Sequence, residues 1–156
     1  MLQYWWVLVV VIGAVAMAWA LGRSAKTFGR EMRHERAREL FKLQRERLEA
    51  HFLQAAAATG KPRGLRWKDC QWENQVEFVR DRETGDLSAL VGVTIQFEAI
   101  EGGDMEGVAA VGNLRHASAV FAFRNDHWLT AGKALFNMFP SEAVEKLDSQ
   151  YERLAF

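Results

Sequence analysis

Cys70 is the single cysteine of the chain and its best candidate nucleophile. A thiol needs a neighbouring base to take its proton, and Asp69, His116 and His127 are the residues that could assist it. His116 falls on the outward side of its strand and His127 lies beside a turn, so both are expected at the surface. A lone cysteine in a tryptophan-flanked segment is typical of a small packed residue. We therefore predict that the protein is not an enzyme.

Two short patterns could bind a metal ion. Glu31 and His34 have the Glu-x-x-His spacing of carboxylate-bridged metal sites, but such sites need a second copy of the motif and further carboxylates. Residues 101–104 combine glycines with acids, a segment too short for a calcium-binding loop and typical of a turn. Gly103 and Gly107 lack the lysine and the hydroxyl residue of a phosphate-binding loop. The sequence predicts no metal and no cofactor.

Charge is unevenly distributed, although the formal net charge is zero. Basic residues outnumber acidic ones in residues 22–50, and the reverse holds in residues 61–156. Glu31, Glu35 and Glu39 interrupt the basic segment, so we expect no nucleic-acid partner. Contact with anionic lipid headgroups, or a role in setting membrane topology alone, fits this pattern better. The candidate membrane-surface residues are Arg23, Lys26, Arg30, Arg33, Arg36 and Arg38.

Residues 2–21 have the length and composition of a transmembrane helix. They contain no charged side chain, and a helix of this length rises about 30 Å, the thickness of the hydrocarbon core. Tyr4, Trp5 and Trp6 stand near one end and Trp19 near the other, where aromatic rings favour the headgroup region. The sequence predicts that a single span anchors the protein in the lipid bilayer.

Two alternatives to an anchor stay open. A buried helix of a soluble protein would normally show a polar stripe, and Gln3 is the only strongly polar residue here. A cleaved signal peptide could use Ala16, Ala18 and Ala20, but the charged segment that usually precedes the apolar run is absent. Because basic residues follow the span, the positive-inside rule places the rest of the chain in the cytoplasm.

Residues 22–60 are predicted to form a basic stalk helix. Residues 24–58 are rich in good helix formers and contain no proline. Gly60 and Pro62 supply a stop, and Gly22 is the expected place for a bend. The better of two apolar stripes is expected to pack on a sheet, and the other leaves self-association open. The better stripe comprises Ala37, Phe41, Leu48, Phe52 and Ala55.

Residues 61–156 are predicted to form an α+β domain. Residues 87–97 alternate between apolar and polar types, which is typical of a strand with one buried face. Residues 75–81 precede them across a turn at residues 82–86, so the two segments form a hairpin. We expect further strands at 108–111, 117–123 and 127–136, a turn at 124–126, and a helix capped by Ser141 that continues through Val144, Leu147, Tyr151 and Leu154.

The predicted fold is therefore α+β: a transmembrane helix that continues into a long basic helix, then a four- to five-stranded antiparallel meander with a C-terminal helix. This outline resembles the cystatin-like and NTF2-like architectures, which by themselves carry no function. Large residues outside the clean strand faces either close the ends of the core or form a partner surface. These residues are Trp67, Trp72, Trp128, Phe136, Met138 and Phe139, of which Trp67, Trp72, Trp128 and Phe139 are the candidate partner surface.

Four segments are GKPRGLRWKDC at 60–70, ALVGVTI at 89–95, FEAIEGG at 97–103 and AVGNLR at 110–115. Through them, the stretch between residues 37 and 137 resembles a family of uncharacterised small bacterial membrane-anchored proteins. The resemblance implies a bacterial inner-membrane setting. It implies no activity, ligand or catalytic residue.

Two functions are consistent with these features. The first is a non-enzymatic interaction module that presents the α+β domain to an unknown protein partner at the cytoplasmic face, and an exposed apolar patch would mark it. The second is a membrane-tethered domain that binds a small ligand in a cavity between sheet and helix. The sequence identifies neither partner nor ligand.

Overall fold

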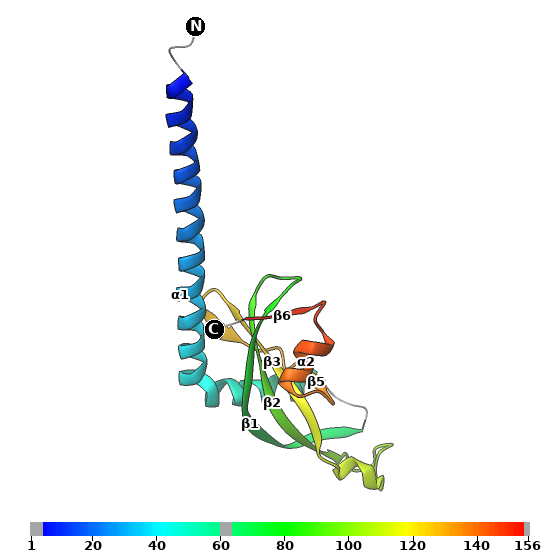
Figure 1. The fold of residues 1–156 in the computed structure, drawn as a ribbon. Coiled ribbons are helices and arrows are strands. Elements are labelled where there is room, and N and C mark those ends of the chain that lie inside the picture. Colours follow the sequence, from blue (N-terminus) through cyan, green and yellow to red (C-terminus); the bar gives the residue numbers. More distant parts are fainter. Residues whose placement is uncertain (1–4, 60–63, 155–156) are drawn as a thin grey trace. The chain divides into compact units, whose positions relative to one another are not determined.

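The computed structural model describes residues 5–59 and 64–154 and, within the first helix, the side chains of residues 9–17, 19 and 31–58. The features predicted at Tyr4, Gly60 and Pro62 lie outside the described residues. The chain divides into two compact units, Met1–Glu39 and Leu40–Phe156. Figure 1 shows the elements in chain order.

The first unit is helical. It belongs to α1 (Trp5–Thr59), which runs without interruption through Gly22, and the helix predicted for residues 24–58 is confirmed. Every described side chain between residues 9 and 19 is exposed. Among the described residues, no helix combines the length and the apolar character that crossing a membrane requires.

The second unit holds a six-stranded antiparallel sheet with the order β4-β3-β2-β1-β6, in which β5 also pairs with β3. The predicted α+β class is confirmed, and the sheet has more strands than the four or five expected. The first four strands form a meander, and β6 returns to the far edge beside β1. The strands are β1 (Leu65–Asp81), β2 (Leu87–Ala99), β3 (Arg115–Arg124), β4 (His127–Leu129), β5 (Ala134–Phe136) and β6 (Tyr151–Arg153).

One face of the sheet packs against the C-terminal part of α1. Phe121 on β3 lies with its ring centroid 5.5 Å from that of Phe41 and 5.8 Å from that of Phe52. Both helix residues belong to the stripe that the sequence predicted to face a sheet, and Leu48 between them is also buried. Aromatic contacts in this range add to the free energy gained from burying apolar area. This packing holds the helix on the sheet.

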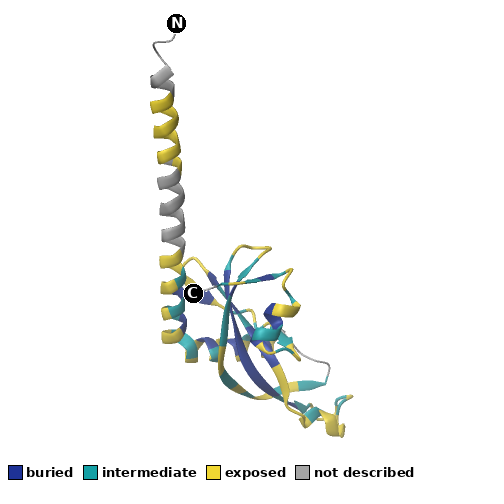
Figure 2. Cartoon of the chain, in the orientation of Figure 1, coloured by how far each residue is buried: buried dark blue, intermediate teal, exposed yellow. Residues whose placement is uncertain are grey.

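The opposite face is also covered, which corrects the prediction that the strand at 87–97 has one buried face. Leu90 of β2 packs with Ala143 and Val144 of α2 (Pro140–Lys146) and with Tyr151 of β6. Residues 87–95 of β2 are therefore all buried, apolar and polar alike, as the dark blue ribbon in Figure 2 shows. Ser118 fits into this second layer because its hydroxyl donates to the Met138 carbonyl at 2.8 Å.

Two glycines allow close approach within these layers. A Cβ at Gly132, which has φ +74°, would lie 2.3 Å from the Ala56 nitrogen of α1. Gly92 lies opposite a bulge in β1, and a Cβ there would lie 2.6 Å from the Glu73 carboxylate. Only glycine accommodates both contacts without displacement of a neighbour.

The predicted hairpin of β1 and β2 is confirmed, with Arg80 opposite Leu87. The turn predicted at 124–126 is also confirmed, and Asn125 and Asp126 have φ values of 50° and 61°. Asparagine and aspartate tolerate this left-handed conformation better than most residues, which suits them to a tight hairpin.

Three element predictions are wrong. Residues 108–111 do not form a strand, and a short 3-10 helix, η1 (Ala109–Gly112), stands there. The strand predicted at 127–136 is divided into β4 and β5, because the chain turns at Gly132 to pass along α1. The C-terminal helix ends at Lys146, and Tyr151 reaches the core from β6. Tyr151 is therefore buried, as the helical spacing predicted, but it lies on a strand and not on a helix.

The predicted cap is also wrong. Phe139 precedes α2, its backbone N–H donates to the Glu142 carboxylate at 3.2 Å, and Pro140 takes the first helical position. Proline suits that position because its missing N–H would have no partner in the helix. The Ser141 hydroxyl instead accepts a hydrogen bond from Gln75 at 3.3 Å.

Candidate ligand-binding site

The residues considered for covalent chemistry are not assembled into a reactive group. Burial, and then the neighbouring Asp69 carboxylate, raise the pKa of the Cys70 thiol from 9.0 to about 11, so the thiol is protonated at neutral pH. The His116 ring nitrogen lies 3.1 Å from the Thr94 hydroxyl, and the His127 ring nitrogen lies 2.7 Å from the Asn125 carbonyl. In the described part of the chain, no hydrogen bond joins Cys70 to a histidine.

The side chains with oxygen and nitrogen ligands are dispersed. Within residues 5–59 and 64–154, no group of three or more His, Cys, Asp or Glu side chains is placed to hold a metal ion. Glu31 is exposed and His34 is half-buried on α1. Glu106 lies in the glycine-rich turn, where its carboxylate accepts the Gly102 N–H at 2.8 Å.

The predicted membrane-surface residues lie along α1. Arg33 and Arg36 are exposed and Arg38 is half-buried. The side chains of Arg23, Lys26 and Arg30 lie outside the described ones, although the helix backbone at these positions is described.

The candidate partner residues do not share one surface. Trp128 is only 4% exposed, and its ring centroid lies 4.9 Å from that of Phe41. Trp72 is half-buried and lies 5.4 Å from the Phe52 ring. These two tryptophans help to close the core beneath α1.

Trp67 and Phe139 have different surroundings. Trp67 is half-buried, and its ring centroid lies 5.1 Å from that of Phe97. Phe139 is exposed and its ring lies 5.1 Å from the His116 ring on β3. Of the four candidates, Phe139 is the only exposed one, and 37% of its surface is accessible.

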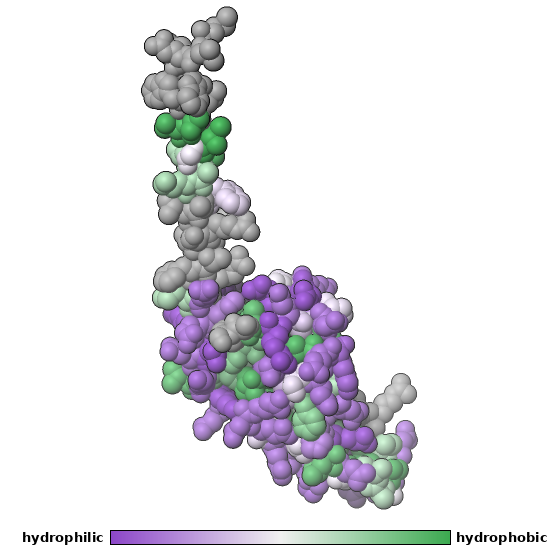
Figure 3. Space-filling model, viewed as in Figure 1, coloured by the Kyte–Doolittle hydropathy of each residue, from purple (hydrophilic) through white to green (hydrophobic). Residues whose placement is uncertain are grey.

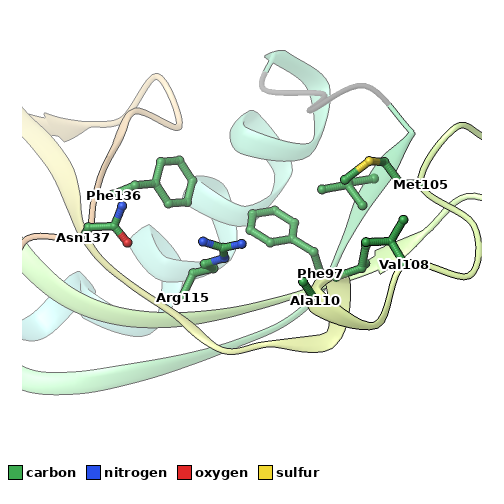
Figure 4. A pocket seen from close by; sticks show the side chains of 9 residues that line it. Phe97, Met105, Val108, Ala110, Arg115, Phe136 and Asn137 are labelled. Atoms are coloured by element: carbon green, nitrogen blue, oxygen red, sulfur yellow. The ribbon is translucent and has the colours of Figure 1, made fainter.

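A recess of about 280 Å³ opens at the end of the sheet where β2 ends and β3 begins. Figure 4 shows its side chains, with Phe136, Asn137 and Arg115 on one side, Met105 and Val108 on the other, and Phe97 between them. Its lining comprises Leu65, Phe97, Met105, Val108, Ala110, Val111, Arg115, Phe136 and Asn137. These residues come from β1, β2, η1, β3, the end of β5 and the connections between them, so the recess does not lie between the sheet and α1.

The connection between β2 and β3 forms one wall of the recess. Backbone N–H groups of Gly103, Glu106 and Val108 donate to carbonyls three residues earlier, at 2.9, 3.0 and 3.3 Å, so the segment is a series of tight turns. The Ile100 N–H donates to the Gly64 carbonyl at 2.9 Å, which ties the segment to the start of β1. The wall is therefore an ordered segment and not an extended loop.

Aromatic rings form the opposite wall. The Phe97 ring centroid lies 5.1 Å from that of Trp67 and 6.2 Å from that of Phe136. Phe136 remains 41% exposed, so its ring borders the recess as well as the packed side of the sheet. The recess thus contains apolar surface that the protein leaves uncovered and that is available to a ligand.

Two polar side chains stand beside this apolar surface. Within the described residues, neither the Arg115 guanidinium nor the Asn137 side-chain amide takes part in a hydrogen bond or ion pair. The Asn137 backbone is fixed, because its N–H donates to the His116 carbonyl at 2.8 Å and its φ is 58°. An apolar recess with a few polar groups at its edge is the common design of small-molecule sites.

A second hollow lies beside β3 and β4, and none of its described lining residues is aromatic. Its lining comprises Val120, Ala122, Arg124, Leu129, Thr130, Ala131 and Lys133. The Arg124 guanidinium already donates to Asp86 at 2.6 Å, so it offers less to a ligand than Arg115 does.

The recess is not predicted by the sequence pattern. The pattern places Phe136 among the large residues outside the clean strand faces and predicts a turn at residues 101–104, but it predicts a strand at residues 108–111. The signal in the sequence was the run Val108-Ala109-Ala110-Val111, whose four apolar residues do not alternate. Comparison of the chain with protein-family models, with curated proteins and with solved structures finds no match.

Proposed function

We propose that this protein is a membrane-anchored, non-enzymatic domain that binds a small ligand in the recess at the end of its sheet. The observation that carries the proposal is the apolar lining of the recess beside two polar side chains without partners. Its volume of about 280 Å³ is close to the lower end of the roughly 300 to 1,000 Å³ typical of small-molecule sites. A compact ligand suits this space.

The anchor is part of the proposal. Residues 2–21 contain no charged side chain, and the described side chains at Val9, Ile12, Val15 and Trp19 are each more than half exposed. A helix that is apolar on every side is stable when it is surrounded by lipid. The basic residues that follow it favour a cytoplasmic location for the sheet domain, at a bacterial inner membrane, and contact with anionic headgroups.

A protein-interaction module is the second candidate. Ile100, Val108 and Leu114 are 43%, 43% and 55% exposed, and all three belong to or adjoin the connection between β2 and β3. Figure 3 shows apolar residues gathered at this end of the second unit. Exposed apolar groups of this kind also occur at sites for protein partners.

A screen of compact apolar molecules against the full-length chain in detergent micelles tests ligand binding. A ligand that binds the native state raises the melting temperature, and the rise grows with the logarithm of the ligand concentration divided by the Kd. Ala110→Trp would fill the recess and abolish the shift, whereas Ala109→Trp, at an adjacent exposed position that does not line the recess, would preserve it. Equal shifts in both variants would show that ligands bind elsewhere and would overturn the proposal.

Topology is tested separately in a bacterial host. A reporter that is active in one compartment only, fused after residue 156, should give a cytoplasmic signal, and the protein should stay with the membrane fraction after alkaline extraction. Recovery of the intact protein in the soluble fraction would remove the anchor from the proposal and leave ligand binding to be judged by the screen.

A further inference from the structure

We infer that the ligand of the recess is a small organic monocarboxylate with an apolar tail, held by Arg115. This inference rests on the proposed function and specifies its ligand class. The tail would cover the recess side of Phe97 and Phe136, and the carboxylate would accept hydrogen bonds from the Arg115 guanidinium. Figure 4 shows the guanidinium directed to the space between these two rings.

The guanidinium of Arg115, which is unpaired within the described residues, supports an anionic ligand. The exposed Arg66, Arg124 and Arg153 side chains, by contrast, each have a carboxylate neighbour. A guanidinium presents paired N–H donors whose geometry matches the two oxygens of a carboxylate. A ligand carboxylate would give Arg115 the kind of neighbour that Arg66, Arg124 and Arg153 already have.

Asn137 supplies a second donor on the same side of the recess. The residue keeps a left-handed backbone, which asparagine tolerates, and its N–H is already used by the His116 carbonyl. Its side-chain amide makes no hydrogen bond within the described residues and can donate to the ligand. The lining offers one formal charge from Arg115 and none of opposite sign.

The charges in and near the recess argue against a phosphate or another dianion as the ligand. Sites for such ligands usually combine several cationic or backbone donors, whereas the lining here contains one cation. Glu101, Asp104 and Glu106 also lie in the neighbouring connection, and their repulsion would act more strongly on two charges than on one. A monoanion with an apolar tail matches both the charge and the walls.

Isothermal titration of the full-length chain in a non-ionic detergent tests the inference with two matched pairs, hexanoate against hexanamide and benzoate against benzamide. Each pair shares its tail and differs in charge. We expect at least one carboxylate to bind about tenfold more tightly than its amide, because only the carboxylate pairs its own negative charge and two acceptor oxygens with the guanidinium.

Three variants identify the residue responsible. Arg115→Gln should remove the preference for the carboxylate and weaken amide binding much less than carboxylate binding. Asn137→Asp keeps a residue that tolerates the backbone conformation and should weaken carboxylate binding by repulsion. Lys68→Gln removes one positive charge from an exposed position that does not line the recess, so it should keep the preference.

Each outcome decides a different point. If carboxylate and amide bind equally and Ala110→Trp abolishes both, the carboxylate inference is overturned and ligand binding in the recess stands. If Lys68→Gln and Arg115→Gln reduce the preference equally, general electrostatics replaces the assigned contact and the inference fails. If no carboxylate binds while the screen finds a neutral ligand, the ligand class is wrong. Loss of the preference in Arg115→Gln alone supports the inference.

Discussion

The packed layer beneath α1 and the recess at the end of the sheet use the same kinds of side chain with opposite results. Phe52 is fully buried, with ring centroids of Trp72 and Phe121 at 5.4 and 5.8 Å. Phe136 has ring neighbours at 6.2 and 6.4 Å and remains 41% exposed. One region is closed by a helix, and the other is left open.

The difference indicates what each region contributes. Close packing around Phe52 stabilises the fold, because filling space gains both burial and contact energy. Around Phe136 the protein forgoes part of that gain, since its apolar surface remains in water. Substitutions should therefore affect folding in the first region and ligand binding in the second.

The largest expected effect is that of Phe52→Ala, which should lower the free energy of unfolding by about 3 to 5 kcal/mol. Phe136→Ala is its matched control, with the same atoms removed from a partly exposed site, and should cost about 1 kcal/mol. Urea unfolding of the full-length chain in detergent, followed by tryptophan fluorescence, measures both. Equal losses would show that the recess is part of the stabilising core and would end the comparison.

Gly132→Ala should be the next most damaging change, at about 3 kcal/mol, because the new Cβ would collide with the α1 backbone and the left-handed conformation disfavours it. Gly85→Ala isolates the second cause: Gly85 has the same φ of +74° but nothing within 4 Å of an added Cβ. It should cost about 1 to 2 kcal/mol. Urea unfolding measures the free energy of unfolding of both variants. Identical losses would show that α1 moves away from the added methyl group without cost.

Much of the closed region could be predicted from the sequence. The stripe through Phe41, Leu48 and Phe52 predicted the helix face that packs on the sheet, and the alternation at 87–97 predicted the central strand. Such patterns persist over several turns or residues, so single exceptions do not hide them. The helix and the first hairpin follow directly from them.

The covered second face and the recess could not be predicted in this way. Ser88, Thr94 and Ser118 look like solvent-facing residues in sequence, yet all are buried because α2 and the chain around it return over the sheet. Arg115 and Phe136 are 21 positions apart and meet only through strand pairing of β3 with β5. Long-range pairing leaves no periodic signal, so a site built from it is invisible in a local pattern.

A smaller effect is expected at Gly92, on the sheet face away from α1. Gly92→Ala should cost about 1 kcal/mol, because the contact is with the end of the flexible Glu73 side chain, which can move at the loss of its 3.3 Å hydrogen bond from Thr94. The cost should fall in a Glu73→Ala background. A double-mutant cycle by urea unfolding measures this coupling, and strict additivity would contradict the contact.

The smallest expected effect on folding is that of Arg115→Gln. Its guanidinium is exposed and has no partner in the described residues, so the free energy of unfolding should change by no more than about 0.5 kcal/mol. A loss comparable to that of Phe136→Ala would show that Arg115 supports the recess wall, and its effect on carboxylate binding would then be indirect. If Arg115→Gln instead leaves the free energy of unfolding unchanged and removes the preference for the carboxylate, the two regions differ as the packing predicts. The charge of Arg115 then contributes to ligand binding and not to the stability of the fold.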